Sequence, residues 1–184
     1  MHSPARRRVG VFLALSLGGL VCLANTPPPE LHDSVPGAVL AGQSKFTFWG
    51  FEVYNAALWV EPGFKSAVFE RHAFALELAY LRDFSNEEIS NRSMDEMRRQ
   101  GGSAVATPAS WRQLLRTAFP DIRKGDRILG LHRPGEGAVF FTNGQRTGAI
   151  GDVDFARRFF GIWLAPETSE PKLRQALLAR LSSR

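Results

Sequence analysis

The chain has 184 residues, of which 44% are hydrophobic and 22% charged, and this composition is typical of one soluble globular domain. Its formal net charge is +5, but residues 1–24 hold three arginines and no acid, so without them 20 basic residues face 18 acidic ones and the net charge is +2. Because these basic residues are scattered, composition and charge argue against a nucleic-acid-binding protein.

The first segment has the pattern of a secretory signal peptide. Arg6–Arg8 precede an uncharged apolar run from Val9 to Leu23, and Ala24 suits the last position before a cleavage site. The run is shorter than the roughly 20 residues that span a bilayer, so cleavage is favoured over the alternative, which is an inner-membrane anchor formed by residues 9–23. The sequence therefore predicts a signal peptide over residues 1–24 and a secreted, periplasmic protein. After cleavage it has no cysteine and no integral membrane segment.

The next segments predict a linker followed by strands. Residues 25–36 contain three consecutive prolines and no periodicity, which favours an extended linker before a domain of residues 37–184. From Lys45 to Val60 apolar and polar residues alternate on either side of Gly50-Phe51, which predicts two strands. Both faces of this segment are fairly apolar, so we expect it to be covered on both sides. His72–Leu81 predicts a third strand.

Two helices are expected after these strands. Ser85 and Glu88 have the spacing of a capping box, which opens a helix that runs to about Gln100. Thr107 as the N-cap and Pro108 in the first turn begin a second helix.

A second block of strands and helices completes the chain. Asn143-Gly144 marks a tight hairpin, and Asp152 and Ser169 each begin a further helix. Because hairpins dominate and strands do not alternate singly with helices, the order predicts an α+β fold with an antiparallel sheet covered by helices. The strands expected here are Arg127–His132, Ala138–Thr142 and Gln145–Ile150.

Several segments resemble the chalcone isomerase family, and more closely its bacterial exported chalcone-isomerase-like branch. They occur in one order across about residues 36–182, and their order is more specific than any one of them. The resemblance implies an open-faced β-sandwich, in which a layer of helices covers a large antiparallel sheet and a ligand lies in the cleft between them. The matching segments are Lys45–Val60, Leu78–Gln100, Gly125–Ile150, Phe155–Leu164 and Ser169–Leu181.

The resemblance also implies polar catalytic residues, most of which are missing here. The family uses an arginine, a threonine, a tyrosine and an asparagine to favour a phenolate and to polarise a ketone. Lys45 is the basic residue nearest to the arginine position, while Trp49 and Phe84 stand at the threonine and tyrosine positions. The asparagine corresponds to Asn91, or to Arg92 if the alignment has a one-residue gap. Since removal of one oxyanion donor costs about 2.7–4 kcal/mol, the parent reaction is not expected.

The non-catalytic branch of the family binds fatty acids through an arginine and a tyrosine that hold the carboxylate. Here Lys45, Tyr54, Tyr80 and Asn91 are the candidate ligand-binding residues. The alternative is that the tyrosines are core aromatics with a hydrogen-bonded hydroxyl and that Lys45 is solvated. The sequence thus favours a non-catalytic protein, without a cofactor, that binds a small apolar or amphipathic ligand such as a fatty acid.

Two other functions stay open. One is an isomerase (intramolecular lyase) of unknown substrate that uses Lys45, Tyr54 or Asn91, with Asn91 as the candidate catalytic residue; the other is a structural or interaction protein of the envelope without a ligand cavity. No metal site is expected, because the three dispersed histidines downstream of the signal segment lack metal-like spacing. An arginine and a tyrosine that converge on an open cleft would argue against an inert relative.

Overall fold

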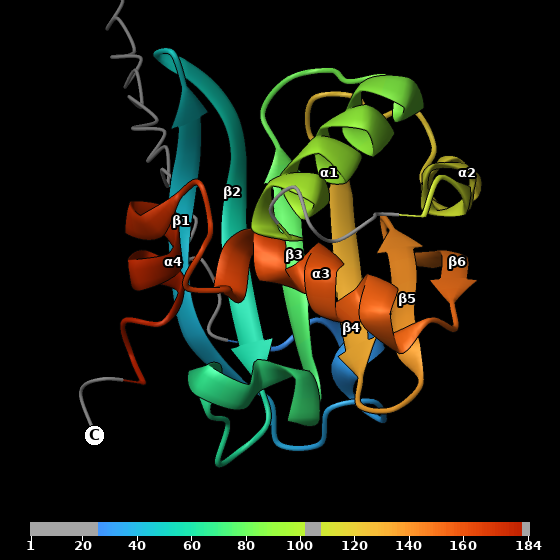
Figure 1. Cartoon of the computed structure of the whole chain (residues 1–184). Coiled ribbons are helices and arrows are strands. Elements are labelled where there is room, and N and C mark those ends of the chain that lie inside the picture. Colours follow the sequence, from blue (N-terminus) through green and yellow to red (C-terminus); the bar gives the residue numbers. More distant parts are fainter. Residues whose placement is uncertain (1–25, 102–107, 182–184) are drawn as a thin grey trace, which may run out of the picture.

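The computed structural model describes residues 26–101 and 108–181. Six strands form one antiparallel sheet in which every strand pairs with its neighbours in sequence, in the order β1 to β6 (Figure 1). The predicted signal segment and its cleavage site lie outside the described residues. The strands are β1 (Val39–Phe48), β2 (Phe51–Val60), β3 (Phe74–Tyr80), β4 (Arg127–Arg133), β5 (Gly137–Thr142) and β6 (Gln145–Ile150).

The α-helices gather on one face of this sheet. Figure 1 shows α1 and α3 crossing in front of the strands, with α4 beside β1 and α2 at the opposite, β6 side. This arrangement confirms the predicted α+β class and the open-faced β-sandwich. The helices are α1 (Asn86–Gly101), α2 (Ser110–Ala118), α3 (Val153–Leu164) and α4 (Pro171–Leu177), and two short 3-10 helices span Pro29–Leu31 and Ser66–Arg71.

The helix starts agree with the sequence at two of the four places. The Ser85 amide donates to the Glu88 carboxylate at 2.7 Å and the Glu88 amide donates to the Ser85 hydroxyl at 3.2 Å, which is the predicted capping box. Asp152 accepts from the Phe155 amide at 2.9 Å.

The other two helices begin later than predicted. α2 starts at Ser110, and Thr107 lies outside the described residues. α4 starts at Pro171, because the Ser169 hydroxyl donates to Glu96 at 2.9 Å instead of capping the helix.

The core between sheet and helices is aromatic. Phe160 of α3 is fully buried and meets Phe74 of β3 edge to face, with ring centroids 4.9 Å apart. His132 of β4 stacks on Phe74 with ring centroids 4.8 Å apart and meets Phe160 edge to face at 5.4 Å. Edge-to-face contacts of this kind add to the stabilisation that burial alone provides.

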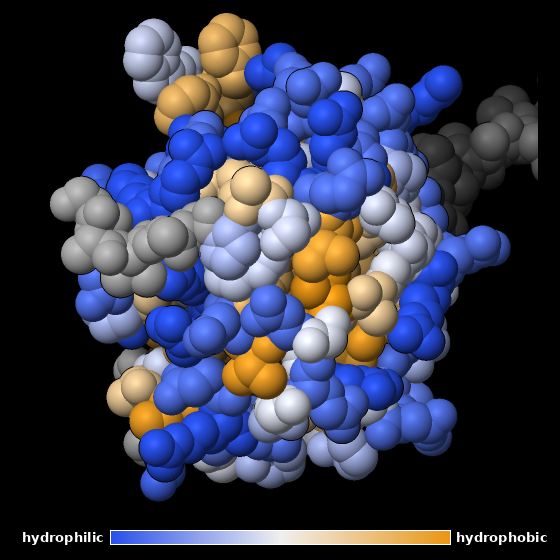
Figure 2. All heavy atoms as spheres, turned by 45° about the vertical axis from the view of Figure 1, so that its right-hand side comes forward, coloured by the Kyte–Doolittle hydropathy of each residue, from blue (hydrophilic) through white to orange (hydrophobic). Residues whose placement is uncertain are grey.

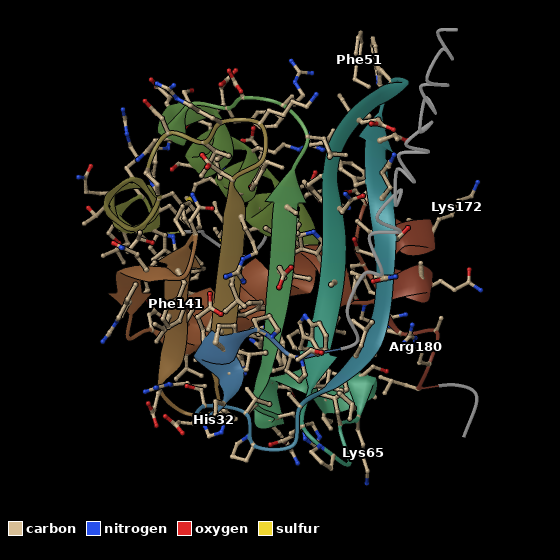
Figure 3. The ribbon with its side chains drawn as sticks, turned by 180° about the vertical axis from the view of Figure 1, so that it is seen from behind. His32, Phe51, Lys65, Phe141, Lys172 and Arg180 are labelled. Atoms are coloured by element: carbon tan, nitrogen blue, oxygen red, sulfur yellow. The ribbon has the colours of Figure 1, made fainter. Side chains whose placement is uncertain are left out.

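A smaller core covers the back of the sheet. The segment that the sequence predicts to be a linker, residues 25–36, places Leu31 and Val35 here, and these side chains are 0% and 1% exposed. Arg127 of β4 holds Glu30 in the same segment and also contacts Glu77 at 3.4 Å. Figure 3 shows this segment lying across the strands from behind. The described part of the segment is therefore packed against the domain, since burial of two apolar residues outweighs the extended tendency of its prolines.

The contact between α4 and β1 requires a glycine. A Cβ at Gly42 would lie 2.2 Å from the Ala176 carbonyl oxygen and 2.5 Å from that of Leu177. Just beyond α4 the Arg180 amide donates to the Ala41 carbonyl at 2.9 Å, so backbone atoms from the two ends of the domain meet directly. The first strand is thereby covered by the last helix.

The buried histidine of β4 makes the stability of the fold depend on pH. Burial lowers the pKa of His132, whose Nδ1 lies 2.8 Å from the His72 carbonyl oxygen and donates to it. The unfolded chain then takes up a proton more readily than the folded one, so stability is lost as the pH falls below about 6.5, the ordinary histidine pKa.

We expect His132→Phe, which keeps a ring against Phe74, to show a smaller loss of unfolding free energy than the wild type between pH 7 and pH 5. Urea unfolding of both proteins across this range measures the difference. Equal pH dependence in the two proteins would show that His132 does not contribute.

Candidate functional site

A cavity of about 330 Å³ lies between the sheet and the helices. Its walls come from β1, β2 and β3, from α1 and α3, and from the start of α4. The volume is at the lower end of the range of about 300–1,000 Å³ that is usual for small-molecule sites. Most lining side chains are apolar: Phe46, Phe48, Phe51, Val53, Leu78, Phe84, Ile89, Phe119, Ile128, Phe159, Ile162, Trp163 and Leu173.

A row of four aromatic rings crosses the sheet side of this cavity. Phe46, Tyr54 and Tyr80 are cross-strand partners on β1, β2 and β3, and Phe84 follows in the loop before α1. Successive ring centroids are 5.1, 5.8 and 5.7 Å apart. Side chains that are directly opposite on adjacent strands share a face of the sheet, so the strand register itself builds this row.

The two tyrosines bring hydroxyl groups into apolar surroundings. The Tyr54 hydroxyl accepts a hydrogen bond from the Trp163 indole at 3.0 Å, so it keeps its own proton for a second partner. No hydrogen bond joins the Tyr80 hydroxyl to another residue in the part of the chain that the structure describes. Burial raises the pKa of Tyr54 and of Tyr80 well above the ordinary value, so both phenols are neutral. They can donate hydrogen bonds at neutral pH but cannot act as bases.

Two arginines line the cavity on its outer side. The guanidinium of Arg82, in the loop after β3, lies 5.3 Å from the ring centroid of Phe84 and 5.9 Å from that of Phe51. Arg92, on α1, lies 5.5 Å from the ring centroid of Phe48, and one of its terminal nitrogens contacts Glu96 at 2.7 Å. The charge of Arg92 also acts to lower the pKa of Tyr54, against the larger effect of burial. The cation and the hydroxyl are thus within electrostatic reach of each other.

The acids beside the cavity are largely engaged by other groups. Glu96 has a side chain that is only 8% exposed, and it is held by Arg92, by Arg99 at 3.0 Å and by the Ser169 hydroxyl at 2.9 Å. Glu88 accepts from the Ser85 amide and hydroxyl, which keep the pKa of Glu88 below its usual value. Repulsion between Glu88 or Glu96 and an anionic ligand is reduced accordingly. The third lining acid, Glu170, forms no ion pair among the described residues, and its charge raises the pKa of Tyr54.

The structure separates the four candidate ligand-binding residues of the sequence analysis. Tyr54 and Tyr80 line the cavity. Lys45 does not: it is adjacent to Phe46 on β1, so it faces the other side of the strand, where it pairs with Glu52 at 2.5 Å. Asn91 is half-buried on α1 but is not part of the lining, whereas the next residue, Arg92, is.

Arg82 and Trp163 are the site residues that sequence reasoning missed. Arg82 lies in a loop, where no periodicity indicates the direction of a side chain. Trp163 is one of several aromatic residues of α3, and a sequence alone does not distinguish aromatic side chains that pack against the sheet from those that line a cavity. Phe84, which stands at the tyrosine position of the family, does line the cavity, but Trp49 at the threonine position does not.

The other residues considered as metal ligands are dispersed. Within residues 26–101 and 108–181 no three potential metal-binding side chains lie together. His32 is exposed, His72 pairs with Glu61 at 2.7 Å and His132 is in the core. A search of the same residues for helices of sufficient length and hydropathy to cross a bilayer found none.

A sequential antiparallel sheet with helices on one face and an apolar cavity between the layers defines a chalcone isomerase-type open-faced β-sandwich. The chain belongs to the chalcone isomerase-like family, whose model matches residues 39–179.

Two individual proteins are also similar to this chain. An uncharacterized protein of Haemophilus influenzae is 25% identical over 142 residues, which cover 77% of this chain and 68% of that protein. The crystal structure of a fatty-acid binding protein from Arabidopsis thaliana superposes with a TM-score of 0.62 over 82% of this chain and 90% of that one. At 14% sequence identity this second similarity shows the shared fold alone.

Proposed function

We propose that this protein binds a fatty acid or a closely related apolar carboxylate in the cavity, without transforming it. The observation that carries the proposal is the combination of an apolar cavity with two neutral phenols and an arginine close to one of them. The structural similarity to a plant fatty-acid binding protein supports the same class of ligand. The unbranched hydrocarbon chain of a fatty acid matches the apolar cavity, and its carboxylate matches the phenols and the arginine.

The apolar part of the ligand would occupy the inner end of the cavity. Leu78, Ile128, Phe159 and Leu173 contribute surface there, and each methylene group removed from water contributes about 0.8 kcal/mol. Because the volume of about 330 Å³ is small for a ligand site, we expect affinity to rise with chain length and then to level off at a medium-chain acid.

The carboxylate would bind between Arg92 and the Tyr54 hydroxyl. Only one terminal nitrogen of Arg92 is assigned to Glu96, so the remaining donors of the guanidinium are free to face a ligand. The Tyr54 hydroxyl already accepts a hydrogen bond from the Trp163 indole, so its own proton is available for donation to the carboxylate. Such charge-assisted hydrogen bonds offset the desolvation of a carboxylate in apolar surroundings.

The proposed setting is the periplasm. The signal pattern of residues 1–24 supports it. N-terminal sequencing of the protein from a periplasmic fraction tests this part: a mature chain that begins at Asn25 is expected, and an intact N-terminus in the membrane fraction would favour an anchor.

The ligand is tested directly by native mass spectrometry and calorimetry. Protein purified gently from its own compartment is expected to carry a bound carboxylic acid. After delipidation it is expected to bind saturated fatty acids, with a break in the affinity series at the chain length that fills the cavity. A ligand-free native protein that also fails to bind the whole series would contradict the proposal.

An isomerase is the second candidate, because an arginine and a tyrosine do meet at this cavity. A neutral phenol beside a guanidinium can stabilise negative charge that develops on a ketone oxygen. Turnover of chalcones or related enones that is lost in Tyr54→Phe would favour catalysis. Binding of fatty acids with no turnover of the enones would favour the carrier.

A further inference from the structure

The turn between β1 and β2 is an exposed aromatic tip, formed by Phe48, Trp49 and Phe51. These side chains are 45%, 88% and 66% exposed. Figure 2 shows apolar side chains that stand out from the molecule at the end of this hairpin, and Figure 3 shows Phe51 at the outer end of β2. Exposed apolar side chains that gather at one projecting point are the usual mark of an interaction site.

The stability of the domain does not explain why a tryptophan occupies position 49. Its φ is +50°, a backbone conformation that is uncommon for a bulky residue, and it precedes Gly50 with φ of +80°. This turn favours Asn-Gly, so asparagine would fit the backbone better than tryptophan does. The Trp49 ring stacks on Phe48, 5.9 Å away between centroids, and is otherwise open to solvent. A residue that violates a local preference without a gain in packing indicates a function.

We propose that the aromatic tip inserts into the interfacial region of a phospholipid bilayer, so that the cavity exchanges its ligand with the membrane. The exchange of a ligand with the membrane rests on the proposed function, whereas the insertion of the tip into the bilayer does not. Tryptophan and other aromatic rings prefer the boundary between headgroups and acyl chains. A protein partner is the weaker alternative, because a stable interface needs about 800 Å² on each side, and a tip of three side chains is too narrow to supply it.

The surroundings of the tip suit a bilayer surface. Arg82 lies over the rings of Phe51 and Phe84, and Arg92 lies over that of Phe48. A guanidinium that stacks on a ring still has N–H donors at its edge, and these can bind a lipid phosphate. Phe48 and Phe51 also line the cavity, whereas Trp49 does not. Insertion of the tip would therefore bring the mouth of the cavity to the membrane, where an amphipathic carboxylate partitions.

The chain supplies its own probe for this contact. It has four tryptophans, and Trp59, Trp111 and Trp163 are 4%, 3% and 7% exposed, so changes in fluorescence on contact with lipid report mainly on Trp49. With vesicles of phosphatidylcholine and a minority of phosphatidylglycerol, the mature chain, which lacks the apolar segment of residues 1–24, is expected to show a blue shift of its emission. Brominated phosphatidylcholine is expected to quench that emission.

Trp49→Asn is the variant that isolates the tip. It installs the favoured Asn-Gly turn, so the fold is retained, and it is expected to weaken partition to these vesicles about tenfold through the loss of one inserted aromatic side chain. Leu114→Gln is the matched control: Leu114 is 38% exposed on α2, at the β6 side of the sheet, and its replacement is expected to leave partition unchanged.

The outcomes separate this inference from the proposed function. Because Trp49 is outside the cavity lining, Trp49→Asn is expected to bind fatty acids in solution as the wild type does. Fatty-acid binding without quenching by brominated lipid would overturn the bilayer contact and leave the carrier function standing. Quenching by brominated lipid in a protein that binds no fatty acid would support the bilayer contact and contradict the carrier function. Equal partition of the wild type and Trp49→Asn would also overturn the bilayer contact.

Discussion

Replacement of Arg92 by glutamine is expected to weaken the binding of a medium-chain fatty acid by roughly 10- to 100-fold, the effect of losing a hydrogen bond to a charged group of about 1.5–3 kcal/mol. The change removes the cation whose charge acts on Tyr54 and leaves the hydroxyl in place. Glu96 keeps Arg99 and Ser169 as partners, so it is not left as an isolated buried charge. Calorimetric titration with the acid measures the effect.

Two controls, a second variant and an uncharged ligand, test whether this loss is specific to the carboxylate. Arg98→Gln, on the same helix, removes an exposed arginine that pairs with Asp95 at 2.8 Å and lies outside the cavity, and it is expected to bind the acid normally. The matching fatty alcohol, which has no charge, is expected to lose much less affinity than the acid in Arg92→Gln. An equal loss for acid and alcohol would mean that Arg92 shapes the cavity and does not hold the carboxylate.

Gly42→Ala is expected to destabilise the domain by about 3 kcal/mol, at the upper end of the usual effect of overpacking. The new methyl group would meet the carbonyl oxygens of Ala176 and Leu177. Both oxygens are backbone atoms at the end of α4, so no side-chain rotation relieves the contact. Urea unfolding followed by circular dichroism measures the change.

Gly151→Ala is the matched control. A Cβ at Gly151 has no contact shorter than 3.8 Å and the residue has no positive φ, so the unfolding free energy is expected to change by less than about 1 kcal/mol. Because Leu173 of α4 lines the cavity, Gly42→Ala is also expected to reduce fatty-acid affinity. Unchanged stability in Gly42→Ala would show that α4 can move away from β1 at little cost.

Local patterns predicted most of the sheet and two of the four helix caps. Alternation identified the hairpin around Gly50, and the Asn143-Gly144 turn occurs as expected, with both residues at positive φ. The first half of β1 was missed because Val39–Ser44 is a run of small and apolar residues with a register shift after Leu40, so it has no regular alternation. The packed segment before β1 was missed because its burial depends on distant partners such as Trp59.

The site was predictable only where strand register determines it. Tyr54 and Tyr80 came from the family resemblance, and their pairing across β2 and β3 places them together in the cavity. Lys45 was chosen because it is near the missing arginine in sequence, although its alternation with Phe46 already directs it to the other face. The position of Arg82 depends on its contact with Phe51, which lies in another segment of the chain. Such contacts leave no periodic signal in a sequence.

The closure of α4 over β1 has a consequence for how the chain folds. The hairpins β1–β2, β4–β5 and β5–β6 have short connections, so they have low contact order and can form early, whereas the β3–β4 pairing spans α1 and α2. The contact of Ala41 with Arg180, by contrast, joins the first strand to the last described residues and must await nearly the whole chain. Until α4 packs against it, β1 is therefore an uncovered edge strand. The chain is most prone to aggregation at this stage of folding.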